Sequence, residues 1–360
     1  EVSLKVDGIY FDPRVVQLAE AFAAQVYLTK STPSGFPERL KLLPHSLKLV
    51  ANLLGWKRPD GTRLYRKAYW SVARKNAKTQ TLAFLATFML YMDPEPEQEI
   101  YIAAKEREQA GLCYEAAVAM IRTNPELEDL VQIKQYQKTI IHRETGSRIK
   151  ALSSEGKSKH GYNPSMVIFD ELHAFGAPEQ ELYDALTTGA VARRAPLTVI
   201  ITTAGTEEQS LCYREYDYAK RVISGLVTDA THLPLIWELA KDDDWTDETL
   251  WSKPNPAIDV IVRREELQTE FKTALAVPSE QNKFRRLHLN QWVNSTEQWI
   301  PLQRWDKCKR DFNLADLEKV PCYGGLDLAA VNDLTAFVLA WPLDDLLYIQ
   351  PWFWIPDEDI

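Results

Sequence analysis

The sequence has few cysteines, and none are paired at metal-binding spacing. The four cysteines are Cys113, Cys212, Cys308 and Cys322, and no C-x-x-C motif occurs. This spacing argues against a structural zinc site and against a disulfide framework. We therefore expect reduced thiols, as in a cytosolic protein.

The sequence also lacks a long apolar run. The longest, TLAFLATFMLYM, covers only residues 81–92, which is too short to span a bilayer and predicts a buried helix. No signal-peptide pattern occurs, so nothing indicates secretion, and we expect no membrane partner. The net charge of -9 argues against a surface that binds nucleic acid everywhere, although it is compatible with a local basic channel.

Glycine is missing from a stretch where a phosphate-binding loop would need it. The stretch WSVARKNAKTQT, Trp70–Thr81, contains Lys78-Thr79 after a strand-like run, but the pattern G-x-x-x-x-G-K-[ST] would place glycines where Val72 and Ala77 stand. Such loops bind phosphate through backbone N–H groups at a helix N-terminus and through one lysine. Taken alone, the stretch is more typical of a basic turn before a helix than of a phosphate-binding loop.

Length and periodicity predict an α/β protein of about two domains. Uninterrupted apolar strands alternate with helices, which is typical of a mostly parallel sheet covered on both faces. The expected strands cover residues 66–73, 99–104, 165–170 and 196–204, and the expected helices cover 13–28, 43–56, 78–92, 105–122, 179–188 and 208–223. A short hairpin is expected over residues 139–152.

Two of these strands end in residues that suit nucleotide chemistry. MVIFD is followed by Glu171, so Asp170 could hold a magnesium shell and Glu171 could polarise a water molecule. VIITTAGT ends in Thr202-Thr203, hydroxyls that could sense a γ-phosphate. An acidic helix cap and an ordinary β-turn are the alternatives for each motif alone. The order of the three motifs predicts an ATPase of the additional-strand class.

At this point the chain resembles the large terminase subunit of tailed bacteriophages, over nearly its whole length. The resemblance is carried by these segments: GWKRPDGTRLYRKAYWSVARKNAKT, TGSRIKALSSEGKSKHGYNPSMVIFDELHAF, VIITTAGT, DYAKRVISG, DDDWTDETLWSKPNP, FRRLHLNQWV and CYGGLDLAAVNDLTAFVLAW. It implies a P-loop NTPase with a three-layer αβα sheet, followed by the start of an RNase H-like nuclease domain.

The resemblance also implies roles for individual residues. Lys78 would contact the β- and γ-phosphates, Thr79 and Asp170 would bind Mg²⁺ with ATP, and Glu171 would be the catalytic carboxylate. The family often carries a basic residue inside the loop, here Arg74, and Thr202 and Thr203 match its coupling motif. The full set expected to contact nucleotide is Arg74, Lys75, Asn76, Ala77, Lys78, Thr79, Gln80, Asp170, Thr202 and Thr203.

The chain departs from the family pattern in three places. Ala77 replaces the loop glycine, and Leu43-Pro44-His45-Ser46 replaces an adenine-contacting Leu-Pro-Trp-Gln. The segment GKSKHGYNP stands where the family usually has an acidic Leu-Asp-Gly. A ring motor also needs an arginine from a neighbouring subunit, for which Arg148, Arg193 and Arg194 are candidates, each with a solvated basic side chain as the alternative.

The carboxyl-terminal part predicts three strands joined by tight turns. Asp327 would be the first-strand metal ligand of an RNase H-like nuclease using Mg²⁺ or Mn²⁺, whereas Asp333 would cap a turn. We expect the remaining metal carboxylates on later strands and no DNA cleavage by this chain. His173 is expected to pack rather than to bind metal. Basic stretches that could contact DNA phosphates are Arg63–Lys67, KFRRLHLNQW and KCKR.

The predicted domain organisation and function follow from these motifs. The predicted segments are an adenine-side helical segment (1–60), an ATPase core (61–240), its helical extension (241–300), a linker (301–320) and a truncated nuclease start (321–360). The predicted function is an ATP-driven motor that moves double-stranded DNA into a procapsid in the host cytoplasm. It would form a homo-oligomeric ring with the portal protein and the small terminase subunit as partners. A non-hydrolysing structural adaptor and a helicase-like ATPase are the alternatives.

Overall fold

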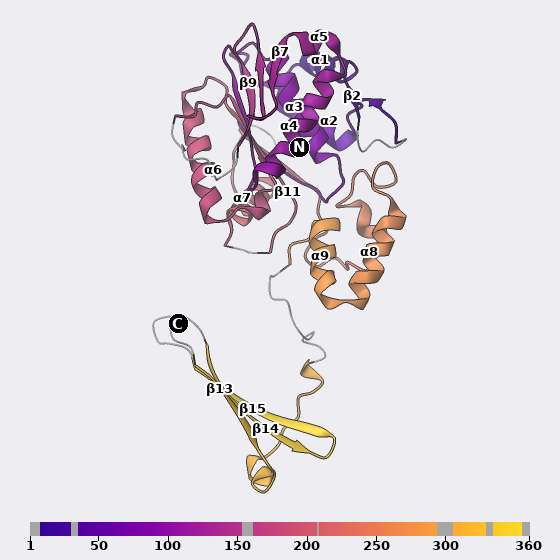
Figure 1. Cartoon of the computed structure of the whole chain (residues 1–360), viewed down its shortest axis with the longest axis vertical. Coiled ribbons are helices and arrows are strands. Elements are labelled where there is room, and N and C mark those ends of the chain that lie inside the picture. Colours follow the sequence, from indigo (N-terminus) through magenta and orange to yellow (C-terminus); the bar gives the residue numbers. More distant parts are fainter. Residues whose placement is uncertain are drawn as a thin grey trace. The chain divides into compact units, whose positions relative to one another are not determined.

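The chain forms two compact units, Glu1–Trp299 and Ile300–Ile360 (Figure 1). The computed structural model describes residues 8–29, 35–152, 161–206, 209–293, 305–328 and 334–354. Among these residues, no helix combines the length and the apolar character needed to cross a bilayer.

An eight-stranded sheet lies at the centre of the described part of the first unit. Its spatial order is β12 (His232–Ile236), β5 (Lys67–Ser71), β11 (Leu197–Thr202), β10 (Met166–Asp170), β6 (Glu99–Ala103), β9 (Arg148–Leu152), β8 (Thr139–His142) and β7 (Val131–Lys134). The pairs from β12 to β9 are parallel, and β8 and β7 continue the sheet as an antiparallel hairpin. The carboxyl ends of β5, β10 and β11 therefore lie next to one another along one edge.

The alternation of side chains along each strand builds two separate cores, one on each face of the sheet. In β10, Ile168 packs in the core on one face and Phe169 in the core on the other. The first face is covered by helices α1 (Pro13–Ala23), α2 (Pro44–Gly55), α3 (Lys78–Met92) and α4 (Arg107–Arg122). The second face is covered by α6 (Ala177–Gly189) and α7 (Leu211–Ile223). The expected three-layer αβα architecture is confirmed.

Short elements complete the first unit. Two small antiparallel pairs join β1 (Tyr10–Phe11) to β4 (Trp56–Lys57) and β2 (Tyr27–Leu28) to β3 (Glu38–Arg39). The remaining helical turns are α5 (Pro125–Asp129), η1 (Leu172–Ala174), η2 (Ala190–Ala192) and η3 (Glu248–Ser252). Helices α8 (Arg264–Ala276) and α9 (Pro278–His288) form a helical extension around Trp251, whose ring lies 5.1 Å from Phe271 and 5.7 Å from Phe284.

The structure corrects the expected elements in three places. The first helix ends at Ala23 rather than continuing to residue 28, and the chain turns into β2. Strands β7 and β12 were not predicted from the sequence. In β12 the sequence HLPLI contains Pro234, which argues against a central strand; the structure places it at the sheet edge, where the missing N–H is tolerated.

The second unit contains the expected three-stranded antiparallel sheet. Strand β13 (Tyr323–Asp327) pairs with β14 (Thr335–Leu343), and β14 pairs with β15 (Leu346–Trp354), after the short turn η4 (Leu314–Leu317). The β14–β15 turn holds Asp344 at φ 54°, a conformation that aspartate tolerates. Asp344 and Asp345 are therefore turn residues.

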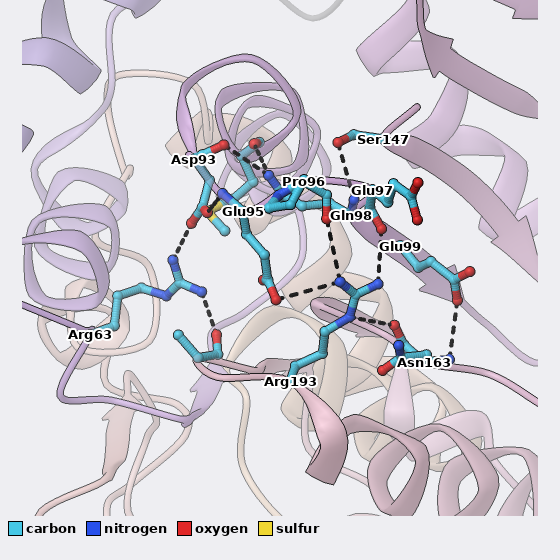
Figure 2. Close-up of polar contacts among 12 residues, drawn as sticks. Arg63, Asp93, Glu95, Pro96, Glu97, Gln98, Glu99, Ser147, Asn163 and Arg193 are labelled. Carbon is cyan, nitrogen blue, oxygen red and sulfur yellow. Dashed lines mark hydrogen bonds and ion pairs between the residues drawn. The ribbon is translucent and has the colours of Figure 1, made fainter. Parts of the chain in front are cut away.

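Arg63 is buried at the amino edge of the large sheet, on the side opposite the carboxyl ends of the strands. Figure 2 shows its guanidinium against the Asp93 carboxylate. The guanidinium also donates to the Ala195 carbonyl, and Arg63 is 6% exposed. Lys67 similarly pairs with Glu215 at 2.6 Å. The charges of Arg63 and Lys67 therefore hold loops of the same chain together, and DNA contact by Arg63–Lys67 stays a prediction.

Arg193 ties three loops together at the same edge. Its guanidinium donates hydrogen bonds to the carbonyls of Asn163 and Glu97, both at 2.9 Å, and reaches Glu95 at 3.5 Å (Figure 2). These loops lead into β10, β6 and β11, so the contacts fix where those parallel strands begin.

We expect Arg63→Met to lower the free energy of unfolding by about 3 kcal/mol, because it leaves the Asp93 carboxylate buried without its partner. Urea unfolding followed by circular dichroism measures the change. The matched control is Arg122→Met, which removes an exposed ion pair to Glu128 with a 3.6 Å separation and should cost less than about 1 kcal/mol. Equal effects of the two substitutions would contradict the burial argument.

Candidate nucleotide-binding site

The loop that follows β5 adopts a glycine-like backbone without glycine. Lys75 has φ 65° and Ala77 has φ 58°, both in the left-handed region. Ala77 is the residue before helix α3 and makes no side-chain capping bond. The first N–H groups of α3 therefore point into the loop without a side-chain acceptor, which is the arrangement that binds anions.

Lys78 turns its side chain into the loop. Its ammonium donates hydrogen bonds to the carbonyl of Val72 at 2.9 Å and of Ala73 at 3.4 Å, and the residue is 7% exposed. Burial lowers the pKa of Lys78 to about 8, and the nearby carboxylates of Glu171 and Asp170 oppose this effect. A cation held this way is already placed for a negatively charged ligand.

Asp170 and Glu171 stand at the carboxyl end of β10, the neighbour of β11 in the sheet. Burial, followed by the charge of Glu171, raises the pKa of Asp170 to about 7. Gln109 contacts its carboxylate at 3.4 Å. Glu171 has φ 57° and lines an open cleft together with Lys78 and Thr79. A buried carboxylate beside a buried lysine, each with a shifted pKa, is typical of a site that binds a charged ligand.

Thr202 ends β11, Thr203 follows it, and both are fully buried. His173, three residues after Asp170, lies against both of them, because its Nδ1 atom is 3.2 Å from each threonine hydroxyl. The same nitrogen is 3.2 Å from the Glu171 carboxylate. His173 packs, as expected, but its contacts also join two of the motifs identified in the sequence.

The side chain of Asn76 anchors the loop on the side that faces the helical extension. Its side-chain amide is fully buried, donates to the carbonyls of Ala73 and Arg74 and to Asn255 at 2.9 Å, and accepts from the Ala257 N–H at 3.0 Å. The side chain therefore faces the helical extension, which leaves only the backbone of Asn76 for a phosphate. The extension also accepts hydrogen bonds from the N–H groups of the loop, through Pro254 and Leu287.

A second buried amide, Asn290, joins the ends of β5 and β11. Its oxygen accepts from the Ala204 N–H at 2.7 Å, and its nitrogen donates to the Ser71 hydroxyl at 2.9 Å and the Trp237 carbonyl at 2.6 Å. Sequence reasoning missed Asn255 and Asn290. Both lie in segments that carry the family resemblance, DDDWTDETLWSKPNP and FRRLHLNQWV. Their partners could not be read from the sequence, because these bonds join positions 86 (Ala204), 179 (Asn76) and 219 (Ser71) apart along the chain.

The cleft above the loop has a volume of about 1920 Å³. Its walls include Pro44 and Ser46 from α2, Lys78 and Thr79 from α3, and Arg263 from the extension. The segment Leu43-Pro44-His45-Ser46, which replaces the usual adenine-contacting motif, forms hydrogen bonds to the loop and to α3. His45 contacts the Asn76 carbonyl at 2.9 Å, and the hydroxyls of Ser46 and Thr81 lie 2.8 Å apart.

Arg286 is a further cationic side chain near the site, and it belongs to KFRRLHLNQW, a stretch predicted from the sequence to contact DNA phosphates. It is half-buried on α9, one residue before the carbonyl of Leu287 that accepts from the Arg74 N–H at 2.9 Å. Burial, followed by the charge of Arg74, lowers its pKa, and Glu171 raises it. Within the described residues, its Nε atom has no hydrogen-bond partner.

The three arginines proposed to act on a neighbouring subunit have partners in this chain. Arg148 pairs with Glu99, Arg193 is held by the loops described above, and Arg194 donates to the Asp60 carbonyl at 3.3 Å. All three precede or begin parallel strands, so they lie at the opposite edge of the sheet from Lys78. Their action on a neighbour stays a prediction.

Several other expectations concern the second unit or residues that are not described. Asp327 ends β13 and is exposed. Asp333 and residues 156–160 of GKSKHGYNP lie outside the described residues. Among the residues that are described, no group of three or more His, Cys, Asp and Glu side chains is placed to hold a metal ion.

Two family models match the chain. The model for the ATPase domain of the terminase large subunit matches residues 44–221, and the model for its endonuclease domain matches residues 226–359. The crystal structure of the HK97 bacteriophage large terminase is 30% identical, with a TM-score of 0.67 over 95% of this chain and 68% of that chain. The chain belongs to the large terminase subunit family.

Curated relatives agree with this assignment. The terminase large subunit of Enterobacteria phage HK97 is 33% identical over 305 residues, which cover 84% of this chain and 58% of the relative. That of Lactococcus phage p2 is 22% identical over 94% of this chain and 62% of its own length. Protein YmfN of Escherichia coli strain K12 is 30% identical over 56% of this chain and 45% of its own. The terminase chain thus spans about three fifths of the phage relatives.

The match to the endonuclease model begins before β12, a strand of the large sheet. The matched region therefore includes the helical extension as well as the second unit. The division into segments at residues 60, 240, 300 and 320 stays a prediction.

The terminase site fits ATP and a divalent cation. Uncapped N–H groups at the start of α3, a buried lysine and a buried carboxylate at the end of β10 supply the donor and acceptor types that a magnesium-bound triphosphate needs. The fit does not depend on glycine, because Ala77 already has the left-handed backbone.

We expect Ala77→Gly to raise the free energy of unfolding by about 0.5–1 kcal/mol, because the relief of left-handed strain exceeds the added chain entropy. Chemical denaturation measures the change. The control is Ala185→Gly within α6, which should lower stability by about 1 kcal/mol. Destabilisation of similar size by both substitutions would mean that Ala77 carries no strain.

Proposed function

We propose that this terminase chain hydrolyses ATP to move double-stranded DNA into a procapsid. The observation that carries the proposal is the meeting of three motifs at one edge of the sheet. Lys78 follows β5, Asp170 and Glu171 end β10, and Thr202-Thr203 ends β11. Lys78 and Glu171, which belong to different elements, line one cleft, and Asp170, Thr202 and Thr203 are buried at the same strand ends. Phosphoryl transfer requires charged groups that are positioned together in this way.

The charge and burial of each side chain determine its proposed role in ATP hydrolysis. Lys78 binds the β- and γ-phosphates, exchanging its bonds to the loop carbonyls for phosphate oxygens. Thr79 and Asp170 hold Mg²⁺, which supplies compensation for the phosphate charge when bound. Glu171 orients the attacking water and accepts its proton, since it lies at the open side of the site.

Arginine side chains compensate the remaining negative charge. Arg74 in the loop and Arg286 on α9 supply positive charge from the same chain. We propose that a homo-oligomeric ring adds an arginine from a neighbouring subunit, with Arg148, Arg193 and Arg194 as candidates. These three arginines would first have to release their partners in the same chain at the amino edge of the sheet.

The remaining roles follow from membership of the terminase family. We propose that the ring acts in the host cytoplasm with the portal protein and the small terminase subunit. DNA would be held through phosphate contacts, for which KCKR at residues 307–310 is exposed. Asp327 would be one ligand of a Mg²⁺ or Mn²⁺ nuclease site whose other carboxylates come from later strands.

A non-hydrolysing structural adaptor is the second candidate function. The observation in its favour is the strained loop, because left-handed φ angles at non-glycine residues resist movement around a nucleotide. A helicase-like ATPase is disfavoured by the second unit, which the endonuclease model matches. Turnover of ATP separates the motor from the adaptor.

We expect magnesium-dependent ATP turnover by the native chain, and a loss of about 10²–10⁴-fold in kcat for Glu171→Gln. Steady-state phosphate release, with and without linear duplex DNA, measures both. The matched control is Glu265→Gln on the exposed surface of α8, which should leave kcat unchanged. Binding of ATP without turnover in any form would favour the adaptor.

We also expect turnover per chain to rise with protein concentration, because a neighbouring subunit completes the charge compensation. Dilution from micromolar to nanomolar concentration in the same assay measures this. Constant turnover per chain across the dilution series would show that Arg74 and Arg286 suffice and that no neighbour is needed.

A further inference from the structure

His173 joins the catalytic carboxylate to the end of the neighbouring strand. It lies in η1, and its backbone N–H donates to the Thr202 hydroxyl at 3.1 Å. Its Nδ1 atom is 3.2 Å from the Glu171 carboxylate and 3.2 Å from each of the hydroxyls of Thr202 and Thr203. The Nδ1 atom thus lies within hydrogen-bond distance of the Glu171 carboxylate and of both threonine hydroxyls.

The hydrogen-bond partners around the ring favour a proton on Nδ1. The Thr202 hydroxyl donates to the Thr203 carbonyl at 2.8 Å, so its proton is already used. An ionised Glu171 can only accept. An Nδ1 atom without a proton could accept only from the Thr203 hydroxyl and would place its lone pair against the Glu171 carboxylate, whereas Nδ1–H donates to Glu171 and leaves the Thr203 hydroxyl free to rotate.

The surroundings keep the ring neutral and in place. Burial lowers the pKa of His173 to about 4, an effect that the charge of Glu171 opposes and Arg286 reinforces. The residue nevertheless reaches the cleft wall beside Glu171. On its other side, the position of a Cβ added at Gly205 would be 3.6 Å from the His173 Cβ and 3.0 Å from Trp292.

We propose that His173 is a positioning residue, whose Nδ1–H orients the Glu171 carboxylate and links that orientation to Thr202 and Thr203. This inference rests on the proposed ATPase function and names a part of it that the motifs do not assign. When β11 shifts, the threonine hydroxyls move relative to Nδ1, and the donor available to Glu171 changes with them. The state of β11 thereby sets whether the carboxylate is aimed at water.

The matched substitutions at His173 differ in where they place an N–H donor. In His173→Asn the side-chain amide lies near the position of Nδ1, whereas in His173→Gln it lies near that of Nε2. His173→Ala removes the donor. We expect kcat to fall about tenfold or more in the Gln and Ala variants, with KM and nucleotide binding changed by less than about twofold, because only orientation is lost. The Asn variant should retain most of the native kcat.

A nuclear magnetic resonance measurement tests the same link without turnover. The chain has six histidines, so the imidazole ¹⁵N signals of His173 can be assigned by their loss in His173→Asn. We expect the Nδ1–H tautomer in the nucleotide-free protein, and a shift of its Nδ1 signal in Glu171→Ala. A Thr203→Val variant should shift the signal as well.

The outcomes separate this inference from the proposed function. Native turnover with equal loss in Asn, Gln and Ala variants, or with no loss in any, would overturn the role of His173 and leave the ATPase intact. Absence of native turnover would overturn the proposed function, while the ¹⁵N signals still test the link. The link between His173 and Glu171 would be overturned by an Nε2–H tautomer of His173, or by a His173 ¹⁵N signal that Glu171→Ala leaves unchanged.

Discussion

The buried amide of Asn76 is the interaction on which the site depends. Left-handed backbone angles at Lys75 and Ala77 cost about 1–2 kcal/mol each without glycine. The contacts of the Asn76 side chain, to two loop carbonyls, to Asn255 and to the Ala257 N–H, return about 0.5–1.5 kcal/mol per hydrogen bond. The loop therefore keeps a glycine-like shape because its centre is anchored, rather than because its residues prefer that shape.

This anchoring makes the helical extension part of the nucleotide site. Asn255 is itself held by the carbonyls of Trp251 and His288, at 3.0 and 2.8 Å, within the aromatic core of the extension. Pro254 and Leu287 accept hydrogen bonds from the loop backbone. The loop of this terminase chain is thus sandwiched between α3 and the extension, and its conformation is a property of both.

Local patterns in the sequence were enough to predict the strands of the large sheet other than β7 and β12, its covering helices and the strand ends that carry the motifs. A continuous apolar run such as MVIFD predicts a buried parallel strand. The polar residue that follows such a strand lies at the carboxyl edge of any parallel sheet. Strand β12 was missed because Pro234 masks it. The roles of Asn255 and Asn290 were missed because only the tertiary fold brings them to the loop. For His173, spacing placed it after Glu171 but could not reveal the hydroxyls it faces.

The amide contacts also constrain how the site can respond to a ligand. Asn76 and Asn290 are saturated with hydrogen bonds in a buried environment, and leaving one such group unpaired costs about 1–3 kcal/mol. A shift of the loop without the extension would break several of these bonds at once, as would a shift of Ala204 without Asn290. The low-cost movement is therefore one in which loop, β11 and extension move together.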